Sequence, residues 1–110
     1  MSSDKSFVDF VVDQMTDAGS ITFRQMFGEY CVYCDTKVVA LICNNKLFVK
    51  PTQGGRAFIG AELVEGRAYP KAKPSFLIED RVEDRDWLSR LIKITASELP
   101  IPKKRRRRVA

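Results

Sequence analysis

Two polar dipeptides divide the apolar stretch between residues 29 and 49 into short pieces. Asp35-Thr36 and Asn44-Asn45 are typical of tight turns, because Asn and Asp tolerate left-handed backbone geometry and hydrogen-bond their own backbone. The pieces are too short for helices and rich in β-branched and aromatic residues, which predicts an antiparallel meander of strands. These strands are Glu29 to Cys34, Val38 to Cys43 and Leu47 to Val49.

Two further strands are expected on either side of this meander. Thr22 to Phe27 precedes it, and Gly28 marks a bend or bulge before the next strand. Ser75 to Glu79 has the same character later in the chain. Together with the helices described next, these strands predict an α+β fold in which an antiparallel meander sheet packs against N- and C-terminal helices.

Helical periodicity appears at both ends of the chain. In the first helix Ser3 is the expected N-cap and Gly19 the expected stop. The last helix is expected from about Asp84 to Leu99, followed by Pro100 and Pro102. The apolar stripes predicted to face the core are Phe7, Phe10, Val11, Met15 and Ala18 in the first helix, and Trp87, Leu88, Leu91, Ile92, Thr95 and Leu99 in the last.

If both hairpins have two-residue turns and regular pairing, the register follows from alternation along the strands. The face expected against the helices carries Cys31, Tyr33, Val38, Ala40, Ile42, Leu47 and Val49. The second face has an apolar centre among lysines, which a soluble monomer rarely leaves bare, so another chain or a C-terminal segment is expected to cover it. Its candidate partner-binding residues are Tyr30, Val32, Val39, Leu41 and Phe48.

The segment from Pro51 to Pro74 is less regular. Thr52 to Ile59 can form a short helix between two glycine stops. The pair Gly54-Gly55 could cradle a phosphate, but the rest of a P-loop or dinucleotide fingerprint is missing, which favours a flexible turn.

The length of 110 residues suits one domain with its own core. We expect a domain over residues 1–100 and a disordered basic tail over 101–110. No apolar run approaches the roughly 20 residues of a membrane-spanning helix, and the N-terminus has no signal-peptide pattern. We therefore expect a cytoplasmic protein without a membrane partner.

The net charge of +5 comes from the tail. Six of the 19 Lys and Arg residues lie there, which leaves 13 against 14 Asp and Glu in the rest of the chain. A run of like charges is typical of a solvated segment that binds polyanions weakly and without sequence preference. The candidate nucleic-acid contacts are Lys103, Lys104, Arg105, Arg106, Arg107 and Arg108.

The absence of histidine excludes Ser-His and Cys-His nucleophile pairs and histidine-containing zinc sites. Three cysteines remain: Cys31, Cys34 and Cys43. Cys31 and Cys34 have C-x-x-C spacing, but in a strand this separation sends the two side chains to opposite faces, so we expect free, buried thiols. The acidic residues from Glu79 to Asp86 suit a helix start. We assign no catalytic, cofactor-binding or metal-ligating residue.

The stretch from Arg24 to Asp35, read as R-x-M-F-G-x-Y-x-x-Y-x-D, resembles the signature of the TfoX N-terminal domain, of the TfoX/Sxy family of bacterial competence regulators. The likeness continues through the strands that follow and covers most of Phe7 to Leu99. Thr36 stands where a glycine is common in the family. The motif residues are Arg24, Met26, Phe27, Gly28, Tyr30, Tyr33 and Asp35.

The resemblance implies a compact α+β domain without known catalytic activity. Longer members carry a separate C-terminal domain, for which this chain has no counterpart, and activate DNA-uptake genes together with the cyclic-AMP receptor protein. Three functions stay open. The favoured one is a small non-enzymatic regulatory or adaptor domain, linked to transcription or competence, that binds a protein partner or forms a homodimer. The alternatives are a nucleic-acid accessory protein that binds phosphates through the tail, and a small thiol or metal-dependent enzyme.

Overall fold

Both predicted turn dipeptides form tight reversals in the computed structural model of the protein. All four of their residues have positive φ angles, from 51° at Asp35 to 75° at Thr36. The structure describes residues 4–26, 29–67 and 73–99. The two turns join three antiparallel strands, which are β2 (Glu29–Cys34), β3 (Lys37–Cys43) and β4 (Lys46–Val49). The predicted meander is confirmed.

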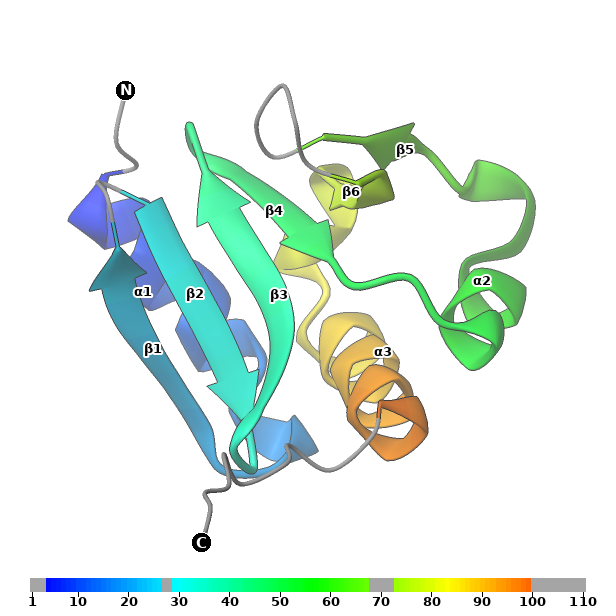
Figure 1. The fold of residues 1–110 in the computed structure, drawn as a ribbon, viewed down its shortest axis with the longest axis horizontal. Coiled ribbons are helices and arrows are strands. Elements are labelled where there is room, and N and C mark those ends of the chain that lie inside the picture. The colour runs from blue at the N-terminus through cyan, green and yellow to red at the C-terminus, as the bar shows by residue number, and fades with distance from the viewer. Residues whose placement is uncertain (1–3, 27–28, 68–72, 100–110) are drawn as a thin grey trace, which may run out of the picture.

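Three more strands complete an antiparallel sheet of six, with the order β1-β2-β3-β4-β6-β5 (Figure 1). β1 (Ile21–Met26) pairs with β2, and β6 (Ser75–Ile78) pairs with β4. The two-residue strand β5 (Glu65–Gly66) pairs with β6 and was not predicted, because so short a segment has no alternation to detect.

The helices confirm the α+β class. α1 (Lys5–Gln14) and α3 (Arg85–Glu98) lie behind the sheet in Figure 1, and α2 (Gln53–Ile59) packs against α3 beside it. Three short 3₁₀ turns adjoin these helices in the described ranges. η1 (Thr16–Ala18) follows α1, η2 (Gly60–Glu62) follows α2, and η3 (Asp80–Glu83) precedes α3. Within the described ranges, none of the helices combines the length and the apolar character that crossing a bilayer requires.

The core lies between one face of the sheet and the helices α1 and α3. Its fully buried side chains include Val8 and Val11 from α1, and Leu88 and Leu91 from α3. The strands contribute Val32, Ala40, Ile42, Leu47, Val49 and Phe76.

A β-bulge between β2 and β3 makes the predicted register wrong for β2. Val32 lies opposite Ala40 but Tyr33 lies opposite Val38, so Val39 is an extra residue. One extra residue reverses the facing of the strand beyond it relative to its neighbour. The predictions for Ala40, Ile42, Leu47 and Val49 therefore hold. Cys31, Tyr33 and Val38 lie on the opposite face from the one expected.

The stripe predicted for the first helix needs a smaller correction. Val8, Val11 and Met15 are fully buried, whereas the Phe10 side chain is 43% exposed. Spacings of three and four from Val8 describe the buried face, and Phe10 lies off that line. The N-cap is Asp4, and Ser3, the predicted N-cap, lies outside the described residues. The α-helix ends at Gln14, before the 3₁₀ turn.

The glycine pair lies in the first turn of α2, not in a flexible turn. The Gly54 N–H donates to Glu98 Oε1 at 2.9 Å, and the Gly55 N–H donates to Thr52 Oγ1 at 3.0 Å. Both amides therefore already have anionic or hydroxyl acceptors, which removes the phosphate-cradle alternative. Gly60, with φ of 71°, ends the helix as predicted.

The last helix matches its prediction. Asp84 is the N-cap, and its carboxylate accepts the Trp87 N–H at 3.1 Å. Leu88, Leu91, Ile92 and Thr95 are buried. At the other end, Lys37 Nζ donates to the Ala96 carbonyl at 2.7 Å, where a cation suits the negative end of the helix dipole.

Candidate functional site

The sheet surface opposite α1 and α3, which we call the open face, is the first candidate for a functional surface. It faces the viewer in Figure 1. Cross-strand partners share a face, so the register identifies its side chains. They are Thr22, Arg24, Glu29, Cys31, Tyr33, Val38, Leu41, Cys43, Lys46, Phe48 and Leu77.

The structure separates the five residues predicted to form a partner-binding face. Tyr30, Val32 and Val39 belong to the buried core. Leu41 and Phe48 pair with each other on the open face, where Leu41 is half-buried and Phe48 is 5% exposed. The bulge explains the separation, because the alternation of a regular ladder would have placed all five on one face.

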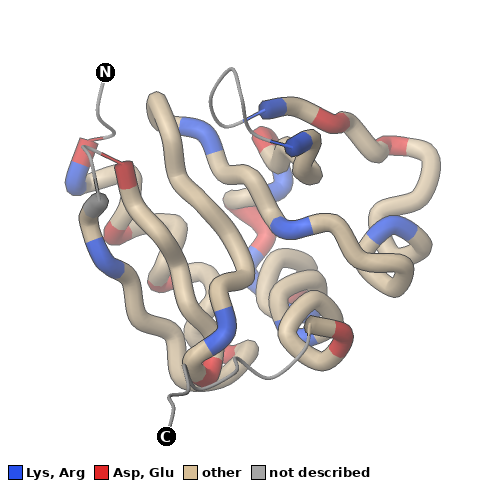
Figure 2. Tube along the Cα trace, in the orientation of Figure 1, with Lys and Arg blue, Asp and Glu red and all other residues tan. Residues whose placement is uncertain are grey.

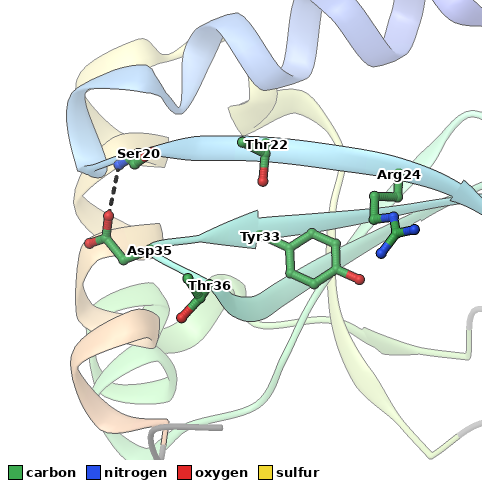
Figure 3. Close-up of a pocket in the computed structure, with 6 residues that line it drawn as sticks. All are labelled: Ser20, Thr22, Arg24, Tyr33, Asp35 and Thr36. Carbon is green, nitrogen blue, oxygen red and sulfur yellow. Dashed lines mark hydrogen bonds between the residues drawn. The ribbon is translucent and has the colours of Figure 1, made fainter.

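At the β1–β2 end of the open face, side chains surround a hollow of about 540 Å³ (Figure 3). Thr22 and Arg24 come from β1, Tyr33 from β2, and Asp35 and Thr36 from the turn that follows. The Ser20 N–H donates to Asp35 Oδ1 at 3.0 Å, which ties the turn to the start of β1. The family-motif residues Arg24, Tyr33 and Asp35 thus line one hollow.

Polar groups set the chemistry of this hollow. Burial and the neighbouring Cys31 thiol, which is also its hydrogen-bond partner, raise the pKa of the Tyr33 phenol, and the Arg24 cation partly opposes them. Tyr33 is therefore a neutral hydroxyl at physiological pH. In Figure 3 the Tyr33 and Arg24 side chains lie next to each other, on the same side of adjacent strands. The hollow thus combines one cation, Arg24, and one carboxylate, Asp35, with hydroxyl groups.

The three cysteines are free and buried, as predicted. Cys31 lies on the open face and Cys34 contacts the helix side, where its thiol approaches the Ala18 carbonyl at 3.9 Å. Burial, then Glu29 and Cys31, raise the pKa of the Cys43 thiol to about 11. Burial and Asp35 raise the pKa of the Cys34 thiol. Both are protonated at neutral pH and are poor nucleophiles.

Charged side chains lie on both layers of the molecule (Figure 2), and on the helix side Lys5 and Arg85 pair with the aspartates of α1 and η1. The exposed side of α1 and η1 carries Asp9, Asp13 and Asp17. On the open face, Arg24 and Lys46 outnumber Glu29, and Lys50 follows directly after β4. The strands of this surface therefore carry a small excess of cations, although the chain outside the tail is nearly neutral.

The remaining predicted site residues have other roles or lie outside the described residues. Tyr30 of the motif packs in the core and meets Phe23 edge to face at 5.7 Å. In the acidic segment, Asp84 caps α3 and pairs with Arg81 at 3.2 Å. Across residues 4–26, 29–67 and 73–99, no three potential metal ligands gather. Of the predicted site residues, Phe27, Gly28 and the basic tail from Lys103 to Arg108 lie outside the described ranges.

Sequence reasoning missed two members of this surface. Thr22 and Leu77 were predicted as strand residues without a role. Thr22 reaches the hollow because β1 pairs in register with β2, and Leu77 extends the apolar centre because β6 pairs with β4. A pairing between segments almost thirty residues apart has no local signal in the sequence.

The chain belongs to the TfoX N-terminal domain family, whose model matches residues 13–99. The family is one of competence-related regulatory domains and is not a known family of enzymes. A similar protein is the "uncharacterized 12.7 kDa protein in trpE 5′ region" of Spirochaeta aurantia. It is 40% identical over 106 residues, which cover 96% of this chain and 91% of the relative. The relative is of similar size.

Proposed function

We propose that this protein is a non-enzymatic regulatory adaptor that binds a partner protein, or a second copy of itself, through the open face. One observation carries the proposal: among the described residues, the helices cover one face of the sheet, and the other face has an apolar centre. Val38, Leu41 and Leu77 are half-buried there around the buried Phe48 ring. Apolar groups gathered on a sheet face mark a site of association.

Burial of the apolar centre would supply part of the binding free energy. Completing the burial of a half-buried leucine contributes about 1 kcal/mol, half the value for a whole side chain. Leu41 and Leu77 with the Tyr33 ring form a small apolar and aromatic centre of the kind that dominates interface energies. The cations at its rim, Arg24 and Lys46, orient an acidic partner and accelerate its association.

A catalytic role receives no support from the sheet residues Cys34, Cys43 and Tyr33. A nucleophilic thiol needs a lowered pKa, whereas the pKa values of Cys34 and Cys43 are raised. Tyr33 is a neutral phenol with a raised pKa, better suited to donating a hydrogen bond than to acting as a base. These groups favour recognition over reaction.

The test is Leu41→Asp, which places a charge at the centre of the open face without removing a core side chain. Phe10→Asp is the matched control, because Phe10 is equally apolar, is 43% exposed and lies on the helix side. We expect Leu41→Asp to abolish co-purification of the partner from nuclease-treated lysate, or to halve the mass of a dimer, while Phe10→Asp does neither. Unchanged partners and unchanged mass in a folded Leu41→Asp chain would contradict the proposal.

A second candidate function, supported by the run of six basic residues from Lys103 to Arg108, is auxiliary binding of nucleic acid. Such a run neutralises phosphates and releases counterions without reading sequence. In this proposal the tail supplies weak attachment to a polyanion, and the open face selects the partner.

A further inference from the structure

Strand β1 is an edge strand whose outer backbone groups have no strand partner. It is first in the strand order, and within the described ranges only β2 pairs with it. The Asp35 N–H donates to the Ser20 carbonyl at 2.9 Å, so Ser20 and Asp35 form a hydrogen-bonded pair at the start of the β1–β2 ladder. By alternation, the backbone groups of Ile21, Phe23 and Gln25 point away from β2.

Most of the usual protections of an edge are missing from β1, whose one charged side chain is Arg24. Its sequence, ITFRQM, has no proline and no lysine, and its pairing with β2 continues without a bulge from Ile21 to Met26. Six regularly paired residues are long enough to accept another strand. Within the described ranges, α1 lies behind β1 and not along its outer side (Figure 1).

The charge beside this edge is also unsatisfied. Within the described ranges, no carboxylate forms an ion pair with Arg24, whose side chain lies in the hollow next to Tyr33 (Figure 3). The nearby acid, Asp35, already accepts the Ser20 N–H. Arg24, Thr22 and Tyr33 together present one cation and two hydroxyls on the open-face side of the edge.

We propose that β1 binds an extended, acidic segment of the partner protein as an added strand, with a carboxylate of that segment in the hollow against Arg24. The inference rests on the proposed function, because the segment belongs to the protein that covers the open face. Main-chain hydrogen bonds to Ile21, Phe23 and Gln25 would provide affinity, as in other cases of strand addition. The cation would provide the preference for acid.

The spacing of a sheet supports this arrangement. An added strand lies about 4.8 Å from β1, and side chains directly opposite each other have Cβ atoms about 5 Å apart. A glutamate or aspartate opposite Arg24 is therefore within reach of a charge-assisted hydrogen bond. Alternate residues of the same segment face the helix side, next to Phe23, where apolar residues fit.

The probe is a ten-residue capped peptide that alternates valine with glutamate, compared with the same peptide carrying lysine for glutamate. Binding is measured by amide chemical shifts of the full chain at about 0.15 M salt, where surface attraction is screened beyond roughly 8 Å. Every titration is repeated on a chain with residues 103–108 replaced by serine, so that binding to the tail is separated. We expect the acidic peptide to bind about 10-fold more tightly than the basic one.

Two substitutions assign the site. Arg24→Gln should remove most of the preference for acid, whereas Arg90→Gln, an exposed position on α3, should not. Gln25→Pro removes one outward N–H without taking a donor from the β1–β2 ladder, and should weaken both peptides. Hydrogen exchange gives the second readout, because the peptide should slow exchange of the Ile21, Phe23 and Gln25 amides and leave those of β5 unchanged.

Equal binding of the two peptides, an Arg24→Gln chain with full preference, or unprotected β1 amides would each overturn this inference. So would β1 amides that are already protected in a dimer without peptide, because a second copy would then occupy the edge. These outcomes are separable from failure of the proposed function. If Leu41→Asp abolishes partner binding while the peptides fail, the open face is the interface and the edge is not. If the acidic peptide binds as expected but Leu41→Asp leaves partner binding and mass unchanged, the edge site is supported and the proposed open-face interface is wrong.

Discussion

Thr36 adopts a backbone conformation that β-branched residues rarely occupy. Its φ of 75° lies in the left-handed region, in a turn where the family commonly has glycine. The threonine also lines the hollow, so a side chain has been placed beside Arg24 and Tyr33 at the cost of local strain. Strain of this kind at a turn raises the energy of the folded state by about 1 kcal/mol.

Thr36→Gly should therefore stabilise the fold by about 1 kcal/mol, because glycine enters the left-handed region without a steric penalty. Denaturant unfolding followed by circular dichroism measures the change. Asn44→Gly is the matched control, since Asn44 has a φ of 54° but asparagine tolerates it, so the gain should be a few tenths of a kcal/mol. A less stable Thr36→Gly chain would show that the threonine side chain contributes more than its backbone strain costs.

The buried Cys43 thiol predicts how stability depends on alkaline pH. Its pKa is about 11 in the folded protein, against an ordinary value of 9.0. Between these values the unfolded chain releases a proton that the folded chain retains, so the free energy of unfolding falls as the pH rises from about 9 to about 11. Below pH 9 this contribution is fully present.

Cys43→Ala should flatten this alkaline fall, whatever its effect at neutral pH. Urea unfolding at pH 8, 9 and 10 measures the slope in both chains. Lys93→Ala, at an exposed position on α3, serves as the control and should retain the slope of the parent. Parallel curves for the parent and Cys43→Ala would contradict the burial of this thiol.

At the scale of elements, the bulge between β2 and β3 decides which side of β2 faces the helices. Val32 and Val38 have the same side chain but lie on opposite faces of the sheet. Val32 is fully buried against α1 and α3, and Val38, opposite Tyr33, is half-buried on the open face. A regular ladder would have placed Val32 on the open face and Val38 against the helices.

Val32→Ala should cost about 2 kcal/mol of stability, since it leaves a small cavity in a packed core. Val38→Ala should cost less than about 1 kcal/mol, because water or a partner already reaches that side chain. The two midpoints in guanidinium chloride give the comparison directly. Equal losses, or a larger loss for Val38→Ala, would mean that the strands pair without the bulge.

At the scale of the whole molecule, charge is segregated in three regions. The exposed side of the α1 and η1 segments is acidic, the open face carries a small excess of cations, and Lys103 to Arg108 carry the charge that makes the chain basic. Long-range attraction of a polyanion thus depends on the tail, while contacts of defined geometry depend on the sheet.

Replacing Lys103 to Arg108 with serine should abolish most binding to duplex DNA and leave the melting temperature nearly unchanged. Thirteen cations against 14 acids remain in the rest of the chain, which gives it no net attraction to phosphates. The logarithm of the binding constant of the parent should fall with the logarithm of salt with a slope no steeper than about −5, for six phosphate contacts. Sequence-specific binding by the serine chain would contradict this, because it would require a recognition surface elsewhere.

Local chemistry alone determined the elements of this protein. The sequence shows these elements directly, because each depends on residues that are near neighbours in the chain. They are the turns at Asp35 and Asn44, the alternation between the turns, and the helical periodicity after Asp84. The family signature likewise placed Arg24, Tyr33 and Asp35 in one short stretch, and the hollow brings these three together.

Tertiary structure alone decided the faces and the edges. The extra residue Val39 is invisible in a sequence whose neighbouring positions are all apolar, yet it moves Tyr30 and Val32 into the core and leaves Tyr33 on the open face. The pairing of β6 with β4, and the free outer side of β1, depend on contacts between distant segments. Alternation specifies that a strand has two faces, but only packing against the helices selects which of them is buried.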